Sequence, residues 1–337
     1  MEYLKASIQT IQTEGIAARL SNYWTSVEQT DEREQAESNE EGIIKLVSEL
    51  NSLLPNSETM NLSLPRLITV GSQSSSKSSV LNRLCNLNVL PTGSQMTTRV
   101  PLNMELIPDS RSRVEFGEYN GDCFCVTKTI PIGYPAVSAD ERMAVRNEIE
   151  ARTNAIAGHG DRIGSLEIIM KVYAPNIQRL SLIDLPGLVS VNKNQYNVKE
   201  EIERLVESYI TSERTLILCV MPARADIETD QGLGFVSKYD PKFERVIGLL
   251  SKPDLMNENT GVENYLENKI PDNLKLKYGY YVVMNSFSTE DESMTGALKA
   301  ERDYFLKHPI YGSMKDRSRL GIKNINRDLN VILRGHV

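Results

Sequence analysis

The sequence predicts an α/β fold with a doubly wound, mostly parallel sheet flanked by helices. Apolar runs with the length of buried strands recur between residues 67 and 284, and segments of helical periodicity separate several of them. Alternation of strand and helix favours parallel strands joined by crossovers, with helices on both faces of the sheet. The expected strands are 67–70, 166–172, 180–183, 215–220, 246–250 and 280–284.

The composition is that of an ordinary globular protein, because 40% of the 337 residues are hydrophobic and 25% are charged. A chain of this length can bury a sizeable core without disulfides or a structural metal. The net charge of -7 argues against a nucleic-acid partner, which usually needs a basic surface. No run approaches the roughly 18 apolar residues of a membrane span, and the N-terminus lacks the apolar core of a signal peptide.

The four cysteines form no pattern typical of a metal site, and they fit a reduced, cytoplasmic setting. Cys123 and Cys125 could form a metal or redox pair. The favoured interpretation is that both lie on one face of a strand as small apolar residues.

Three regions are expected along the chain: a helical and acidic N-terminal extension over 1–60, a nucleotide-binding domain over 61–312, and a C-terminal helix over 313–337. Apolar residues at helical spacing predict an amphipathic helix over 43–54, and a second stripe is formed by Ile322, Ile325, Leu329 and Ile332. The two stripes predict a small helical bundle; the alternative is that each helix packs separately on the sheet.

A candidate phosphate-binding loop, GSQSSSKS, lies between the first expected strand and a helix that begins at Lys77. In such loops backbone N–H groups surround the phosphates, the lysine contacts β and γ oxygens, and the hydroxyl of the next residue binds Mg²⁺. Ser76 stands at the position where the motif usually has its second glycine. Glycine is favoured there because the backbone can need a torsion that a side chain resists. A serine-rich turn before a helix is the competing interpretation. The candidate binding residues are Gly71, Ser72, Ser75, Ser76, Lys77, Ser78 and Ser79.

Two later motifs support the loop. In LSLIDLPGLV, Asp184 can approach Mg²⁺, and the N–H of Gly187 can bond a γ-phosphate. In VIGLLSKPDLM, Asp254 can accept hydrogen bonds from N1 and N2 of guanine, which adenine cannot donate. The stem of Lys252 would stack over the base. This argues against an ATP-dependent kinase or transport ATPase, which would share the phosphate loop.

Thr98, in LPTGSQMTTRVPL, is the expected switch threonine, and its hydroxyl would join Ser78 at Mg²⁺ when a triphosphate is bound. The adjacent Thr97 is an alternative.

The stretches VGSQSSSKSSVLNRL, LPTGSQMTTRVPL, KVYAPNIQRLSLIDLPGL, RTLILCVMPARADIETDQ, DPKFERVIGLLSKPDLM and ALKAERDYFLKHPIY are collinear and span about residues 64 to 311. They resemble the dynamin superfamily of large GTPases, and SKPDLM and ADIETD are similar to its Mx-like branch. The resemblance implies that Gln73 and Ser74 position the attacking water and hold a monovalent cation, K⁺ or Na⁺, that Gly93 helps to enclose. It also implies that Asp226 lies at a nucleotide-dependent dimer interface, and that Asn285 lies at the base and ribose edge.

The expected function is therefore hydrolysis of GTP with Mg²⁺, coupled to domain pairing and to membrane remodelling or assembly. Membrane contact would come through parts beyond this chain. The residues expected to act in catalysis are Gln73, Ser74, Lys77, Thr98 and Gly187. The sequence departs from the family pattern at Ser76, Gln95 and Ser286. Ser76 in particular favours an alternative, a degenerate GTPase that serves as a nucleotide-binding or scaffold module.

Overall fold

The computed structural model divides the chain into two compact units, residues 1–63 and 64–337. It describes residues 66–93, 98–121, 123–177, 179–190, 197–224, 226–256, 261–285 and 294–336, all within the second unit. The predicted helix over 43–54, and with it the N-terminal half of the predicted bundle, lies outside the described residues. Within those ranges no helix is both long enough and apolar enough to cross a bilayer.

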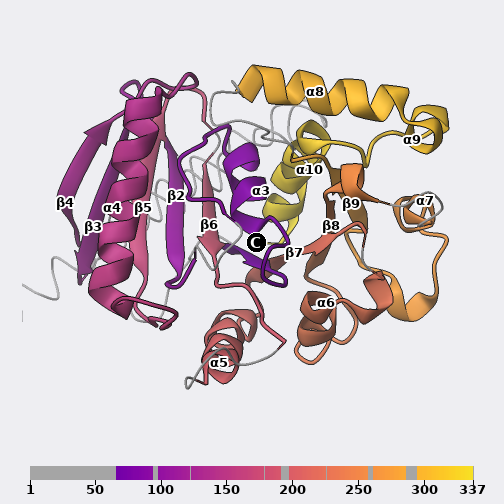
Figure 1. Cartoon of the computed structure of the whole chain (residues 1–337), viewed down its shortest axis with the longest axis horizontal. Helices are drawn as coiled ribbons and strands as arrows, with labels where there is room; N and C mark the ends of the chain where they lie inside the picture. Colours follow the sequence, from indigo (N-terminus) through magenta and orange to yellow (C-terminus); the bar gives the residue numbers. More distant parts are fainter. Residues whose placement is uncertain are drawn as a thin grey trace, which may run out of the picture. The chain divides into compact units, whose positions relative to one another are not determined.

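The described residues form a nine-stranded sheet in the order β4-β3-β5-β2-β6-β1-β7-β8-β9 (Figure 1). The strands β6, β1, β7, β8 and β9 run parallel to one another. The strands β2 and β5 form a second parallel pair, and antiparallel pairings join β2 to β6, β3 to β5 and β3 to β4. The strand bounds are β1 Arg66–Val70, β2 Leu102–Pro108, β3 Arg113–Asn120, β4 Cys123–Pro131, β5 Ile168–Ala174, β6 Leu180–Asp184, β7 Thr215–Pro222, β8 Val246–Ser251 and β9 Tyr280–Val283.

Helices cover both faces of this sheet. Along β7, Leu216 and Leu218 enter one hydrophobic cluster and Ile217 and Cys219 enter another, because successive strand residues point to opposite faces. The first cluster includes α3, α4 and α10, and the second includes α5, α6, α7 and α9. This arrangement confirms the doubly wound α/β fold. The helix bounds are α3 Lys77–Leu84, α4 Ala139–Ala157, α5 Val198–Ile210, α6 Gln231–Val236, α7 Val262–Leu266, α8 Met294–Lys307, α9 Pro309–Ser313 and α10 Ile322–Gly335, and the short 3₁₀ turns are η1 Ile227–Thr229, η2 Pro253–Leu255 and η3 Asp272–Leu274.

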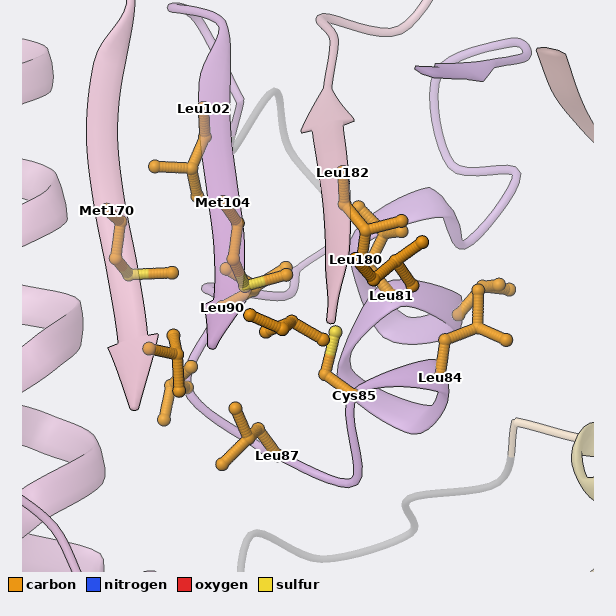
Figure 2. Packing of buried hydrophobic residues seen from close by; sticks show 14 of the residues in the cluster. Leu81, Leu84, Cys85, Leu87, Leu90, Leu102, Met104, Met170, Leu180 and Leu182 are labelled. Carbon is orange, nitrogen blue, oxygen red and sulfur yellow. The ribbon is translucent and has the colours of Figure 1, made fainter. Parts of the chain in front are cut away.

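The core beside α3 fixes the loop that precedes this helix. Leu81 and Leu84 of α3 belong to one hydrophobic cluster with Leu182 of β6 and Met104 of β2 (Figure 2). Truncating one such buried side chain typically costs about 2–5 kcal/mol. This packing anchors α3 beside β6, and with it the loop that precedes the helix.

No bounds were predicted from the sequence for the strands β2, β3 and β4 or for the helix α4. In α4, one residue in each turn is buried, namely Val145, Ile149, Thr153 and Ala157, so its apolar stripe is narrow. The edge strand β4 contains Cys123 and Cys125, and both side chains are exposed. They lie two residues apart on this strand and therefore on one face of it, as the favoured interpretation expects.

The C-terminal helix α10 packs on the same domain as the sheet. Ile322, Ile325 and Leu329 are buried, as the stripe predicts, and Leu333 continues the buried face, while Ile332 is partly buried. The helix contacts α3 and β9.

Candidate active site

The loop between β1 and α3 begins at Gly71 and ends at Ser76, the residue that caps α3. Ser76 has φ 73° and ψ 27°, in the left-handed region, and Ser74 has φ 68°. A residue with a side chain pays about 1–2 kcal/mol for this conformation. The torsion that favours glycine at position 76 is therefore present, and a serine adopts it.

Two glycines allow the loop to approach its neighbours. A Cβ on Gly71 would lie 2.2 Å from the carbonyl oxygen of Val220, and a Cβ on Gly187 would lie 2.8 Å from the backbone Cα of Gln73 and from Lys77 Nζ. The loop after β6 is joined to the phosphate loop, because Gln73 N donates to Leu188 O at 2.8 Å and Leu188 N donates to Gly71 O at 3.0 Å. Any substitution at Gly187 would push these two loops apart.

The ammonium group of Lys77 is almost completely buried, and its side chain turns back onto the loop. Lys77 Nζ donates to Gly71 O at 3.2 Å and to Ser72 O at 3.1 Å. Burial lowers the pKa of Lys77 to about 8, although the nearby Asp184 carboxylate opposes this shift. The site therefore holds a cation whose charge is poorly compensated, which favours an anionic ligand.

Three oxygen-bearing side chains converge next to Lys77. Ser78 Oγ donates to Asp184 Oδ2 at 2.7 Å, and Thr98 Oγ1 donates to the same oxygen at 3.0 Å. The two hydroxyl oxygens are 3.3 Å apart. Burial raises the pKa of Asp184, while Lys77 and the hydroxyl donors oppose that shift.

This cluster fits Mg²⁺. In an octahedral shell with metal–oxygen distances of about 2.1 Å, neighbouring oxygens lie about 3.0 Å apart. The oxygens of Ser78, Thr98 and Asp184 lie 2.7 to 3.3 Å apart, close to that spacing. The predicted metal ligands Ser78 and Thr98 are thus adjacent, whereas Thr97 and Gln95 lie outside the described residues.

Two buried hydroxyls that support the site were not predicted. Thr69 Oγ1 donates to Asp184 Oδ1 at 3.1 Å and lies 3.3 Å from Ile183 O. Ser251 Oγ lies 2.8 Å from Ser75 O and 3.2 Å from Met221 O, and so ties the end of β8 to the phosphate loop. The only available signal was a polar residue in each of the apolar strands LITV and VIGLLS.

The candidate base-recognition residues follow β8 and β9. Lys252 has φ 57°, and its Nζ donates to Ser74 O at 2.9 Å. Asp254 lies exposed in η2. Asn285 follows β9, and both polar atoms of its amide are buried without a hydrogen-bond partner in the described part of the chain.

A cavity brings most of the predicted phosphate and catalytic residues together. It is lined by Gln73, Ser74, Ser76, Lys77, Ser78, Ser79, Thr92, Gly93, Thr98 and Gly187. Ser75 is fully buried and is not among the residues that line the cavity, and Ser72 pairs with Leu188. Asp226 does not line the cavity; it caps η1 at an exposed position, where its carboxylate accepts from Glu228 N at 3.1 Å.

Comparison with known proteins agrees with this geometry. A family model described as "Dynamin family" matches residues 67–253, and one described as "Dynamin central region" matches residues 262–337. The chain belongs to the dynamin family. It is 35% identical over 303 residues to Dynamin-2 of Rattus norvegicus, covering 88% of this chain and 32% of the relative.

Other dynamins give the same result. The identity is 36% over 283 residues to Dynamin of Drosophila melanogaster, with 82% of this chain and 30% of the relative covered. Dynamin-1 of Rattus norvegicus is 33% identical over 303 residues, with 88% and 33% covered. The chain thus spans about a third of the length of these curated relatives. The first dynamin match extends from β1 to Pro253 and so contains the phosphate loop, Thr98, Asp184 and Lys252.

Proposed function

We propose that this dynamin-family chain binds GTP together with Mg²⁺ and hydrolyses it to GDP and inorganic phosphate. The observation that carries the proposal is the cluster of Ser78, Thr98 and Asp184 beside the buried ammonium of Lys77. A divalent cation and a polyphosphate would complete this arrangement, because the cation takes hard oxygen ligands and the phosphates neutralise Lys77.

In the bound state, Lys77 would exchange its bonds to Gly71 O and Ser72 O for phosphate oxygens. The hydroxyls of Ser78 and Thr98 would hold the metal, and Asp184, which accepts from both hydroxyls, would orient them. Mg²⁺ supplies charge neutralisation on the phosphates when bound. The N-terminus of α3 adds its partial positive charge to the same anion.

Hydrolysis requires a water molecule in line with the bond between the γ-phosphorus and its bridging oxygen. We assign Gln73 and Ser74 to orient that water, and Gly187 N–H to bond a γ-phosphate oxygen. A monovalent cation near Ser74 and Gly93 would offset charge that develops in the transition state. The support is that Gln73, Ser74, Gly93 and Gly187 line one cavity with Lys77. The water oxygen bonds to phosphorus as the bond between phosphorus and the bridging oxygen breaks. GDP leaves with the electron pair of that bond, and the proton that the water loses passes to an oxygen of the released phosphate or to solvent.

Guanine selection is assigned to the loops after β8 and β9. The carboxylate of Asp254 would accept hydrogen bonds from N1 and N2 of the base, and the stem of Lys252 would cover its ring. Asn285 would meet the base edge, and its amide has buried polar atoms without partners in the described residues. A base that cannot satisfy these groups leaves them unpaired, which is the physical origin of selectivity.

We infer that hydrolysis is coupled to pairing of two such domains and, through parts beyond this chain, to membrane remodelling. Asp226 is exposed at the start of η1 and is available to a second copy. Ser76 favours an alternative, a scaffold function. The strained torsion of this residue makes the conformation of the phosphate loop less stable than a glycine would. The survival of Lys77, Ser78, Thr98 and Asp184 in one cluster favours catalysis.

The test is to titrate a fluorescent non-hydrolysable GTP analogue with Mg²⁺ and K⁺ and to measure phosphate release from GTP. The comparison variants are Lys77→Ala, which removes the phosphate contact, and Ser76→Gly, which relieves the loop. Saturable binding with turnover that Lys77→Ala abolishes supports the proposal. Saturable binding without turnover, in both the wild type and the Ser76→Gly variant, would support the scaffold function instead.

A further inference from the structure

A buried ion pair lies away from the phosphate cavity. Arg83 of α3 and Glu301 of α8 meet at 2.9 Å between Nη2 and Oε2, and their side chains are only 1% and 5% exposed. Replacing a buried ion pair with apolar residues is often neutral or stabilising, so stability alone does not explain this pair. A fixed geometry is the better explanation, and the contacts of the pair show which geometry it fixes.

The pair holds one backbone residue from both sides. Met284 N donates to Glu301 Oε1 at 3.0 Å, and Arg83 Nη1 donates to Met284 O at 3.4 Å. Met284 directly follows β9 and directly precedes Asn285. A guanidinium is a planar fork with fixed donor directions, so it can bind Glu301 and the Met284 carbonyl at the same time.

Among the described residues, the side chain of Asn285 has no equivalent hydrogen-bond anchor. Both polar atoms of its amide are buried and have no hydrogen-bond partner among the described residues. Its position therefore depends on the backbone that carries it, and that backbone is held at Met284.

The same carboxylate also fastens the start of α10. Glu301 Oε2 accepts from Ile322 N at 3.1 Å, at the first turn of that helix. Next to it, Gly321 N donates to Val282 O at 2.8 Å, so α10 begins directly beside β9. Glu301 thus connects β9, α8 and α10, and Arg83 connects all of them to the helix that follows the phosphate loop.

We propose that Arg83 and Glu301 are positioning residues for base recognition: by holding the Met284 backbone, they set the place of the Asn285 amide at the purine edge. This inference rests on the proposed function, because it assigns Asn285 to the base. It differs from a purely structural role, in which the pair would merely join α3, α8 and α10 and would affect all ligands equally.

The experiment uses the full chain and the variants Arg83→Met, Glu301→Gln and the double variant. The matched control is the substitution Val145→Ala. Val145 is fully buried on α4 and makes none of the hydrogen bonds to Met284 described above, so its truncation destabilises the domain without removing them. A fluorescent GTP analogue is displaced by GTP, by ATP and by inorganic tripolyphosphate, well below the unfolding temperature of each variant. Tripolyphosphate reports the phosphate loop without a base.

We expect each variant of the pair to weaken GTP affinity about tenfold, the worth of one well-placed hydrogen bond. Tripolyphosphate affinity should stay within about twofold, so that the preference for GTP over ATP falls. Loss of affinity for GTP and tripolyphosphate by the same factor, as in a loosened fold, would overturn the inference, as would no change in either. A wild-type chain that binds tripolyphosphate but prefers no base would instead contradict the proposed function.

Hydrogen exchange on the wild type decides the matter if the variants do not fold. GTP should slow exchange of the Met284 and Ile322 amides, which both donate to Glu301, more than tripolyphosphate does. Equal protection by the two ligands would show that the base is not coupled to the pair.

Discussion

At position 76 a serine occupies a left-handed backbone conformation, with φ 73°. Ser76→Gly should relieve about 1–2 kcal/mol of backbone strain in the folded protein. The greater conformational entropy of glycine in the unfolded chain offsets about 0.5–1 kcal/mol of this gain. We therefore expect Ser76→Gly to stabilise the ligand-free protein by about 0.5–1 kcal/mol. Urea unfolding measures this change. Asn176→Gly is the matched control, because Asn176 has φ 57° in the turn after β5. Both substitutions should stabilise the fold, but only Ser76→Gly should tighten nucleotide binding; equal effects on binding would show that the strain at position 76 is irrelevant to the site.

Thr69 is the buried hydroxyl that holds Asp184 from behind. Thr69→Val keeps the shape of the side chain but leaves Asp184 Oδ1 without this donor. Because a hydrogen bond to a charged group contributes about 1.5–3 kcal/mol, we expect a loss of stability in that range and several-fold weaker Mg²⁺-dependent nucleotide binding. Thr153→Val, which removes a bond within α4 to Ile149 O, is the control. Unchanged dependence on Mg²⁺ concentration in Thr69→Val would contradict this role.

Lys77 predicts a distinct pH dependence. Burial lowers its pKa from 10.5 to about 8, so between these values the unfolded chain binds a proton that the folded chain does not. Ligand-free stability attributable to Lys77 therefore increases as the pH rises through this window. Binding of a triphosphate needs the charged lysine, so GTP affinity should decrease above about pH 8, by up to about tenfold per pH unit.

The control for this profile is Lys77→Arg, since a guanidinium stays charged throughout the range. The titration of the ligand itself is common to both proteins and cancels in the comparison. A wild-type affinity that falls no faster than that of Lys77→Arg between pH 7 and 9 would show that Lys77 is not deprotonated there.

At the scale of elements, the helix α10 contributes to the stability of the domain because it packs against the core beside α3 and β9. Leu329 is 1% exposed against the core, whereas Val331, two residues later on the same helix, is 69% exposed. We expect Leu329→Ala to reduce the free energy of unfolding by about 2–5 kcal/mol, and Val331→Ala to change it by less than about 0.5 kcal/mol. Chemical denaturation followed by circular dichroism measures both. A small effect of Leu329→Ala would mean that α10 does not belong to the cooperative fold.

The elements differ in how well the sequence predicted them. The buried parallel strands, such as β1, β7 and β8, are continuous apolar runs and were located within a residue or two. The β3–β4 hairpin and α4 lie at the edge of the sheet, where few side chains are buried and the periodic signal is weak. The phosphate loop could be predicted because its motif is local in sequence. Arg83 and Glu301 could not, because their pairing joins positions 218 residues apart.

At the scale of the whole molecule, the strand order explains why distant motifs form one site. The carboxyl ends of the parallel strands β1, β6, β8 and β9 all lie on the same side of the sheet, where ligands bind in open α/β folds. The phosphate loop and Lys252 directly follow β1 and β8, Asp184 ends β6, and Asn285 lies two residues after β9. The fold therefore places the phosphate and base motifs along a single edge.

A base-specificity switch at Asp254 tests guanine recognition directly. A carboxylate accepts from N1–H and N2–H of guanine, whereas the amide of Asp254→Asn pairs its N–H with the O2 of xanthine and its oxygen with N1–H. We predict that the wild type binds GTP in preference to XTP and ATP with Mg²⁺, and that Asp254→Asn prefers XTP by about tenfold or more. Wild-type binding without preference for guanine, or an unchanged preference in Asp254→Asn, would show that Asp254 does not recognise a guanine base in this site.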